Sequence, residues 1–178
     1  MYVNESLRPV EFHTKSNYAE HVWYRINKLL IGVCYRSTNK DVVGQNNYIE
    51  LNNSQTLIMG DFSYPDIDWD TCTSNSADLE TEEFINTIED CFYTQHVLHP
   101  TRGDAVLDLV LSSDPDLVND VEVINKLENS DHNMVCFNIR FGGMAYHKKR
   151  LIRNYKSGDY SSIKDLSLIH ISEPTRPY

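Results

Sequence analysis

The sequence predicts a sheet-rich α/β layered domain, and two observations carry this prediction. Several short runs have the periodicity of strands, and one longer run has the pattern of an amphipathic helix. Long polar loops separate these elements, and no internal repeat is present. Strands and a helix that each bury one face pack better as layers than as a helical bundle.

The first two predicted strands form a hairpin. Side chains alternate over His21–Ile26, and a more apolar run follows over Leu29–Tyr35. Asn27 and Lys28 lie between them and suit a turn. Residues 1–19 are polar and irregular, and they do not resemble the start of an independent domain.

A long polar loop is expected next. It covers residues 36–55, with a short helix around Tyr48–Leu51. A buried strand follows over Thr56–Met59. Residues 65–75 are rich in Asp and are interpreted as a solvated loop.

The clearest helix is predicted over Leu79–Phe92. Asp78 suits its N-cap, and the acids of its first turn suit the positive end of the helix dipole. The apolar residues that share one face are Phe84, Ile85, Ile88, Cys91 and Phe92. We interpret this helix as a packing element without chemistry.

Three more strands are expected after the helix. They are Val106–Leu111, a weak strand within residues 115–124, and Met134–Phe141. His96 and His99 lie between the helix and these strands, but no Cys or Glu completes a tetrahedral zinc set, so a zinc site is disfavoured.

Composition narrows the function classes. The 178 residues fit one domain, and their 40% hydrophobic content is enough for a core. The net charge of −10 disfavours a broad nucleic-acid-binding surface, although an enzyme can still grip one phosphate through a metal. The four cysteines form no CxxC pair, which favours a reducing compartment. No signal-peptide pattern opens the chain, and no apolar run has the length of a membrane span.

Three acids and one histidine suggest a metal-and-phosphate site. Asp61 directly follows an apolar run that ends at Gly60, and Asp131 and His132 directly precede another strand. Hydrolysis of a phosphodiester needs its charge neutralised and a water activated, for which Mg²⁺ and carboxylates are suited.

Asp108 differs because it lies inside an apolar strand. A buried lone carboxylate is costly, so it needs a partner, and His132 is the obvious one. Such a pair holds the imidazole in one tautomer, so that it can face a phosphate. The alternative, equally open from spacing, is that backbone donors satisfy Asp108 and His132 is a surface residue.

Three motifs in order give the chain a resemblance to a known superfamily. They are Gly60-Asp61-Phe62, Leu107-Asp108-Leu109-Val110-Leu111 and Ser130-Asp131-His132. In this order they resemble the endonuclease/exonuclease/phosphatase superfamily. Ile31–Arg36 and His99–Arg102 make the chain most similar to the endonuclease domain of non-LTR (LINE-type) retrotransposon polyproteins, over residues 20–141.

The resemblance implies a fold and an activity. The fold is a four-layer αββα sandwich with two sheets packed face to face between helices. The activity is Mg²⁺-dependent (or Mn²⁺-dependent) nicking of DNA, which primes the reverse transcriptase domain of the same polyprotein. The resemblance therefore also implies a nuclear or intracellular location.

The resemblance assigns roles to individual residues. Asp61 matches the acid that orients or deprotonates the attacking water, and Asp131 matches a metal-associated acid. His132 matches the phosphate-contacting histidine, Asp108 its carboxylate partner, and Tyr35 a tyrosine near the scissile phosphate. In addition, Thr101 and Arg102 lie in the region that approaches the DNA.

Two departures from the family pattern reduce the expected activity. Ser63 replaces an asparagine of the catalytic set and offers one hydroxyl in place of an amide. The family's opening asparagine and its metal-binding glutamate have no match in this chain. We therefore expect a partial domain over residues 1–145, incomplete at its N-terminus and weakly active or inactive.

Two other functions remain open from the sequence. One is a phosphatase or exonuclease of the same superfamily, which would use the same acids with different substrate-contact loops. The other is an interaction module that has lost catalysis.

The end of the chain differs in character from the rest. We expect a basic linker over residues 146–165. Leu166–Arg176 resembles a translated sequencing adapter, so residues 166–178 are expected to be an artefact of the reading frame.

Overall fold

The computed structural model describes residues 1–13, 20–36, 55–76 and 78–140. The helix expected around residues 48–51, the linker over 146–165 and the tail over 166–178 lie outside the described residues, as does Phe141. The described part belongs to one compact unit, Met1–Phe141.

The predicted sheet-rich α/β class is confirmed. The described elements are η1 (Glu5–Leu7), β1 (Val10–Glu11), β2 (His21–Ile26), β3 (Leu29–Tyr35), β4 (Gln55–Asp61), β5 (Ile67–Asp68), β6 (Thr73–Ser74), α1 (Leu79–Asp90), β7 (Thr94–Gln95), β8 (Asp108–Ser112), β9 (Val118–Ile124) and β10 (Met134–Ile139).

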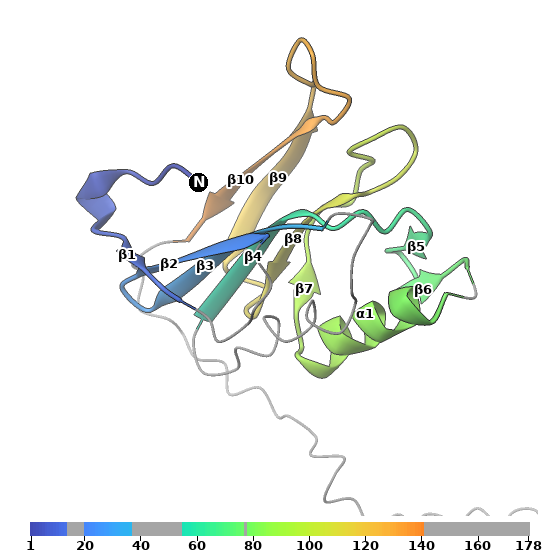
Figure 1. Ribbon diagram of the computed structural model, residues 1–178, viewed down its shortest axis with the longest axis horizontal. Coiled ribbons are helices and arrows are strands. Elements are labelled where there is room, and N and C mark those ends of the chain that lie inside the picture. Colours follow the sequence, from blue (N-terminus) through green and yellow to red (C-terminus); the bar gives the residue numbers. More distant parts are fainter. Residues whose placement is uncertain (14–19, 37–54, 77, 141–178) are drawn as a thin grey trace, which may run out of the picture. The chain divides into compact units, whose positions relative to one another are not determined.

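A six-stranded sheet forms the centre of the fold, in the order β1-β2-β3-β4-β8-β7 (Figure 1). The predicted hairpin β2–β3 is antiparallel, with Asn27 in its turn at a positive φ of 54°. Strands β3 and β4 are parallel, whereas β4 and β8 are antiparallel. Strands β9 and β10 form a separate antiparallel pair, and β5 and β6 form another.

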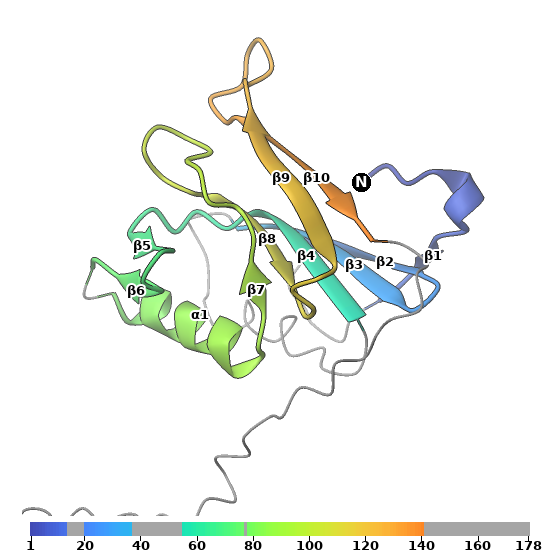
Figure 2. The same ribbon diagram turned by 180° about the vertical axis from the view of Figure 1, so that it is seen from behind.

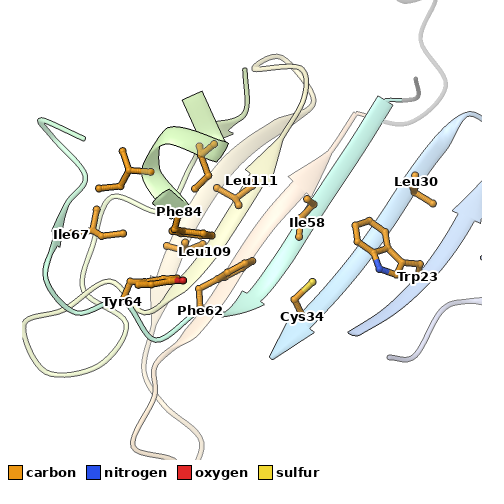
Figure 3. Close-up of a cluster of buried hydrophobic side chains, with 12 residues drawn as sticks. Trp23, Leu30, Cys34, Ile58, Phe62, Tyr64, Ile67, Phe84, Leu109 and Leu111 are labelled. Atoms are coloured by element: carbon orange, nitrogen blue, oxygen red, sulfur yellow. The ribbon is translucent and has the colours of Figure 1, made fainter. Parts of the chain in front are cut away.

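Both faces of the large sheet are covered. One face packs against α1, and residues of that core are labelled in Figure 3. The other face carries Ile31, Leu57 and Val110 and packs against apolar side chains of β9 and β10. The hairpin β9–β10 crosses the sheet in Figure 1 and Figure 2. The described residues therefore form a helix layer, a large sheet and a second sheet.

Helix α1 begins as predicted. The side chain of Asp78 accepts a hydrogen bond from the Glu80 N–H, and a hydrogen bond from the Thr81 hydroxyl lowers the pKa of the Asp78 carboxyl. The helix ends earlier than predicted, at Asp90. Phe92 turns out of it with a φ of 57° and is exposed, while Thr81 is buried on the helix face.

Two strand boundaries and one predicted loop also differ from the prediction. Strand β4 extends to Asp61, and the acidic loop over residues 65–75 contains the short pair β5–β6. Strand β8 begins at Asp108, so this acid opens the strand and does not lie inside it. The reason is that the chain before Asp108 is turned by Thr101, whose hydroxyl oxygen accepts the N–H groups of Leu107 and Asp108.

A glycine is required at Gly60, near the C-terminal end of β4. Its φ is 147°, and a Cβ at this position would collide with the carbonyl oxygen of Cys34 on β3. Only glycine allows the two strands to approach this closely. Among the described residues, no helix has the length and apolar character that a membrane span needs.

Candidate active site

Three neighbouring strands bring Tyr35, Asp61 and Asp108 into one row. Tyr35 ends β3 and pairs with Asp61, which ends β4, and Asp61 pairs with Asp108 at the start of β8. Paired positions on neighbouring strands present their side chains on the same face of a sheet. The three residues therefore share one face at one end of the sheet.

His132 joins this row through Asp108. Its Nδ1 lies 2.7 Å from Asp108 Oδ2, and the two side chains are 20% and 25% exposed. A carboxylate only accepts, so Nδ1 carries the hydrogen and Nε2 is left as the ring nitrogen for other partners. The predicted contact is present, and its carboxylate is half-buried, not sealed inside a strand.

Asp61 is held by Ser63. The backbone N–H of Ser63 donates to Asp61 Oδ1 at 2.9 Å, and its hydroxyl donates to the same oxygen at 2.8 Å. Ser63 adopts a positive φ of 49°, which directs both donors backward onto Asp61. The hydroxyl hydrogen is therefore used within the turn, in a contact with Asp61.

Thr101 requires a correction. Its side chain is fully buried, and its hydroxyl oxygen lies 3.0 Å from the N–H groups of both Leu107 and Asp108. Its carbonyl accepts the N–H of Asn133 at 2.7 Å. A direct side-chain contact with DNA is not available to a residue in this position, so Thr101 instead fixes the start of β8 and the segment next to His132.

Arg102 and Asp131 form an ion pair, with 2.6 Å between Nη2 and Oδ2. Both side chains are exposed, and exposed pairs contribute little free energy, so this pair opens at low cost. It joins the loop before β8 to the loop between β9 and β10. These loops (yellow-green and orange) project from the same end of the sheet in Figure 1 and Figure 2.

The described residues do not assemble a complete metal site. In the part of the chain that the structure describes, no three His, Cys, Asp or Glu side chains gather as a metal-binding group. Mg²⁺ is usually bound by one or two carboxylates together with waters and substrate phosphates, so Asp61 and Asp131 remain the candidate ligands of such an ion.

Sequence reasoning missed the role of Arg36 at this site. Its guanidinium forms an ion pair with Glu80 of α1 and donates to the carbonyl of Ser63 at 3.0 Å. Glu80 is one of the first-turn acids, for which the sequence indicates only a favourable interaction with the helix dipole. The two residues lie 44 positions apart, and no local pattern in the sequence connects them.

A second histidine contact lies at the other end of β8. His96 Nε2 is 2.7 Å from Ser112 Oγ, and Ser112 donates to the carbonyl of Asp114 at 2.7 Å. Ser112 is fully buried, and burial lowers the pKa of His96.

Comparison with known proteins gives matches of two kinds. A family model described as endonuclease-reverse transcriptase matches residues 29–136. Among solved structures, the endonuclease domain of TRAS1, a telomere-specific non-LTR retrotransposon, matches with a TM-score of 0.50 and 19% identity. The match covers 67% of this chain and 60% of that domain.

A 3′ phosphatase from Neisseria, NExo, bound to a product DNA hairpin, also matches, with a TM-score of 0.50 and 16% identity. That match covers 75% of this chain and 73% of the phosphatase chain. At these identities the two structures show a shared fold. Among curated proteins no match is found.

Proposed function

The chain belongs to the endonuclease-reverse transcriptase family within the endonuclease/exonuclease/phosphatase superfamily, and from this premise we propose that it is a DNA-nicking phosphodiesterase domain of a non-LTR retrotransposon. The nick would prime a reverse transcriptase domain of the same polyprotein, in the nucleus. The observation that carries the proposal is the row Tyr35, Asp61 and Asp108 with His132 bonded to its end.

Asp61 is proposed to orient the attacking water. The N–H and the hydroxyl of Ser63 both donate to Asp61 Oδ1, whereas Asp61 Oδ2 makes no hydrogen bond to the described residues. A carboxylate held through one oxygen presents the other in a fixed direction, which is what positioning a water requires.

His132 is proposed to contact the phosphate. Asp108 holds Nδ1, so Nε2 is the nitrogen that would meet a phosphate oxygen. Tyr35 lies beside Asp61 in the register, and its side chain is exposed, so its phenol is proposed to approach the scissile phosphate. Donors aimed at the phosphate stabilise the charge that develops in the transition state.

Metal dependence is part of the proposal. Bound Mg²⁺ or Mn²⁺ would supply Lewis-acid stabilisation of the phosphate, and Asp131 is the acid that we propose to associate with it. The Asp131 carboxylate is exposed and, among the described residues, is paired only with the exposed Arg102, and such a pair opens at low cost, which would leave the carboxylate available to the ion. Nicking is proposed to be weak, because Ser63 directs its hydroxyl hydrogen to Asp61 and not to a phosphate.

Conversion of supercoiled plasmid to the nicked form tests the proposal. The chain is incubated with Mg²⁺ or Mn²⁺, or with EDTA, and compared with Asp61→Asn and with Asp66→Asn, an exposed acid of the next loop. We expect slow, metal-dependent nicking that is lost in Asp61→Asn and kept in Asp66→Asn.

Two results would contradict the proposal. An intact plasmid under all metal conditions would favour the interaction module. Release of phosphate from 3′-phosphorylated DNA without nicking would favour a phosphatase.

A further inference from the structure

Arg36 contacts the turn after Asp61 in three ways. Its backbone N–H donates to the carbonyl of Asp61 at 2.9 Å, and its Nη1 donates to the carbonyl of Ser63 at 3.0 Å. Its Cζ lies 4.1 Å from the centre of the Tyr64 ring. One residue at the end of β3 therefore contacts the backbone and a side chain of the turn that carries Asp61.

Glu80 fixes the other side of the guanidinium. Its Oε1 accepts Nε of Arg36 at 3.2 Å and forms the ion pair with Nη2. The two side chains are only 15% and 21% exposed, so this pair is shielded far more than Arg102–Asp131. Glu80 lies in the first turn of α1, next to the Asp78 cap, so the guanidinium is attached to a defined point of the helix layer.

The aromatic ring below Arg36 is fixed as well. Tyr64 stacks on Phe84 of α1, with ring centroids 4.3 Å apart and an interplanar angle of 18°. Figure 3 shows these two rings against each other with Phe62 beside them. Arg36 thus covers the end of a rigid stack built on α1.

Ser63 transmits this support to Asp61. Its three backbone and side-chain polar groups are all used: the N–H and hydroxyl on Asp61 Oδ1, and the carbonyl on Arg36. A non-glycine residue at positive φ persists only where its surroundings hold it there. The Arg36 contact is what holds the carbonyl side of this strained residue.

We propose that Arg36 is a positioning residue, which acts through Ser63 to fix the direction of the Asp61 carboxylate and is itself fixed by Glu80. The inference rests on the proposed function of Asp61 as the acid that orients the water. Lysine would not replace Arg36, because a single ammonium group lacks the planar fork that reaches Glu80 and Ser63 together.

Arg36→Lys tests the inference with two measurements. Amide hydrogen exchange should be several-fold faster at Ser63 and unchanged at Ile58, a fully buried residue of β4 that reports on the fold. In the nicking assay, kcat should fall roughly 10- to 100-fold with KM unchanged, since a misplaced group slows chemistry without weakening DNA binding.

Arg25→Lys is the matched control. Arg25 on β2 also lies over an aromatic ring, with its Cζ 5.0 Å from the Phe12 centroid, but it contacts no part of the Asp61 turn. Equal Ser63 exchange and equal kcat in Arg36→Lys and Arg25→Lys would overturn the inference and leave the proposed function standing.

The two proposals fail in different ways. A wild-type chain that does not nick DNA contradicts the proposed function, and hydrogen exchange at Ser63 then decides alone whether Arg36 holds the turn.

If Arg36→Lys also speeds exchange at Ile58, the substitution has destabilised the whole fold, and Glu80→Gln is used in its place. Glu80→Gln keeps Arg36 and should also speed amide exchange at Ser63, but by less than Arg36→Lys does. An unchanged exchange rate at Ser63 would count against the inference.

Discussion

Strand β8 carries a histidine contact at each of its two ends, and the two contacts have opposite character. At its first residue, Asp108 accepts from His132, and at its last residue, Ser112 meets His96. The second set, with Asp114 close by, has the residue types of a hydrolase triad. The direction of the Ser112 hydrogen bond explains why this set does not have the arrangement of a triad.

Ser112 donates its hydrogen to the carbonyl of Asp114, so it can only accept from His96. It is also fully buried, and no substrate reaches its oxygen. Asp108 instead leaves Nε2 of a partly exposed His132 available. The residue types do not distinguish the two ends of the strand. The direction of each hydrogen bond and the exposure of the side chains do.

The largest difference is expected from His132→Ala and His96→Ala. His132→Ala should lower plasmid nicking about 100-fold or more, because a group that contacts the phosphate is lost. His96→Ala should leave the nicking rate of the folded protein unchanged. Both rates are measured at saturating metal, after circular dichroism confirms folding, and equal losses would abolish the distinction between the two ends.

A smaller effect is expected from removing one buried hydroxyl at each end. Thr101→Val and Ser112→Ala should each cost about 1–3 kcal/mol in urea unfolding, because buried polar groups lose their partner. Only Thr101→Val should also lower nicking, since Thr101 positions the backbone of Asp108. A Ser112→Ala variant with reduced nicking would show that the far end influences catalysis.

The smallest expected effect is a pH dependence of stability at the His96 end. Burial lowers the pKa of His96 in the folded state, so the unfolded chain takes up its proton first as the pH falls. The contribution of neutral His96 to the free energy of unfolding is complete above the pKa that His96 has in the unfolded chain. It is lost as the pH falls below about 6.5.

Urea unfolding should therefore show a smaller loss of stability between about pH 7.5 and 5.5 in His96→Gln than in the wild type. Partial burial lowers the pKa of His21 as well, so His21 contributes a loss of stability of the same sign in both proteins. An unchanged loss in His96→Gln would assign the whole effect to other groups.

Local patterns predicted much of the fold. The hairpin β2–β3, the cap of α1 at Asp78 and the apolar strand before Asp61 follow from alternation, capping and composition within a few residues. The contact between Asp108 and His132 was predictable as one of two alternatives, because a carboxylate in an apolar run needs a partner.

The remaining features depend on contacts between distant residues. The burial of Thr101, the start of β8 at Asp108 and the bracing of Ser63 by Arg36 depend on which segments meet, which no local pattern specifies. Ser63 illustrates the limit most clearly. Its residue type indicated only that one hydroxyl replaces an amide, and its backbone conformation shows that this hydroxyl is directed to Asp61.

The register of the central sheet has a consequence for how the molecule folds. Tyr35, Asp61 and Asp108 are adjacent in space but far apart along the chain, and Asp61 meets Tyr35 through a parallel pairing. Pairings of this kind close long loops and form slowly, whereas the hairpin β2–β3 closes locally and forms fast. During refolding, the hairpin should gain amide protection before the paired positions Tyr35, Asp61 and Asp108 do, so that the candidate site is assembled in the last steps of folding.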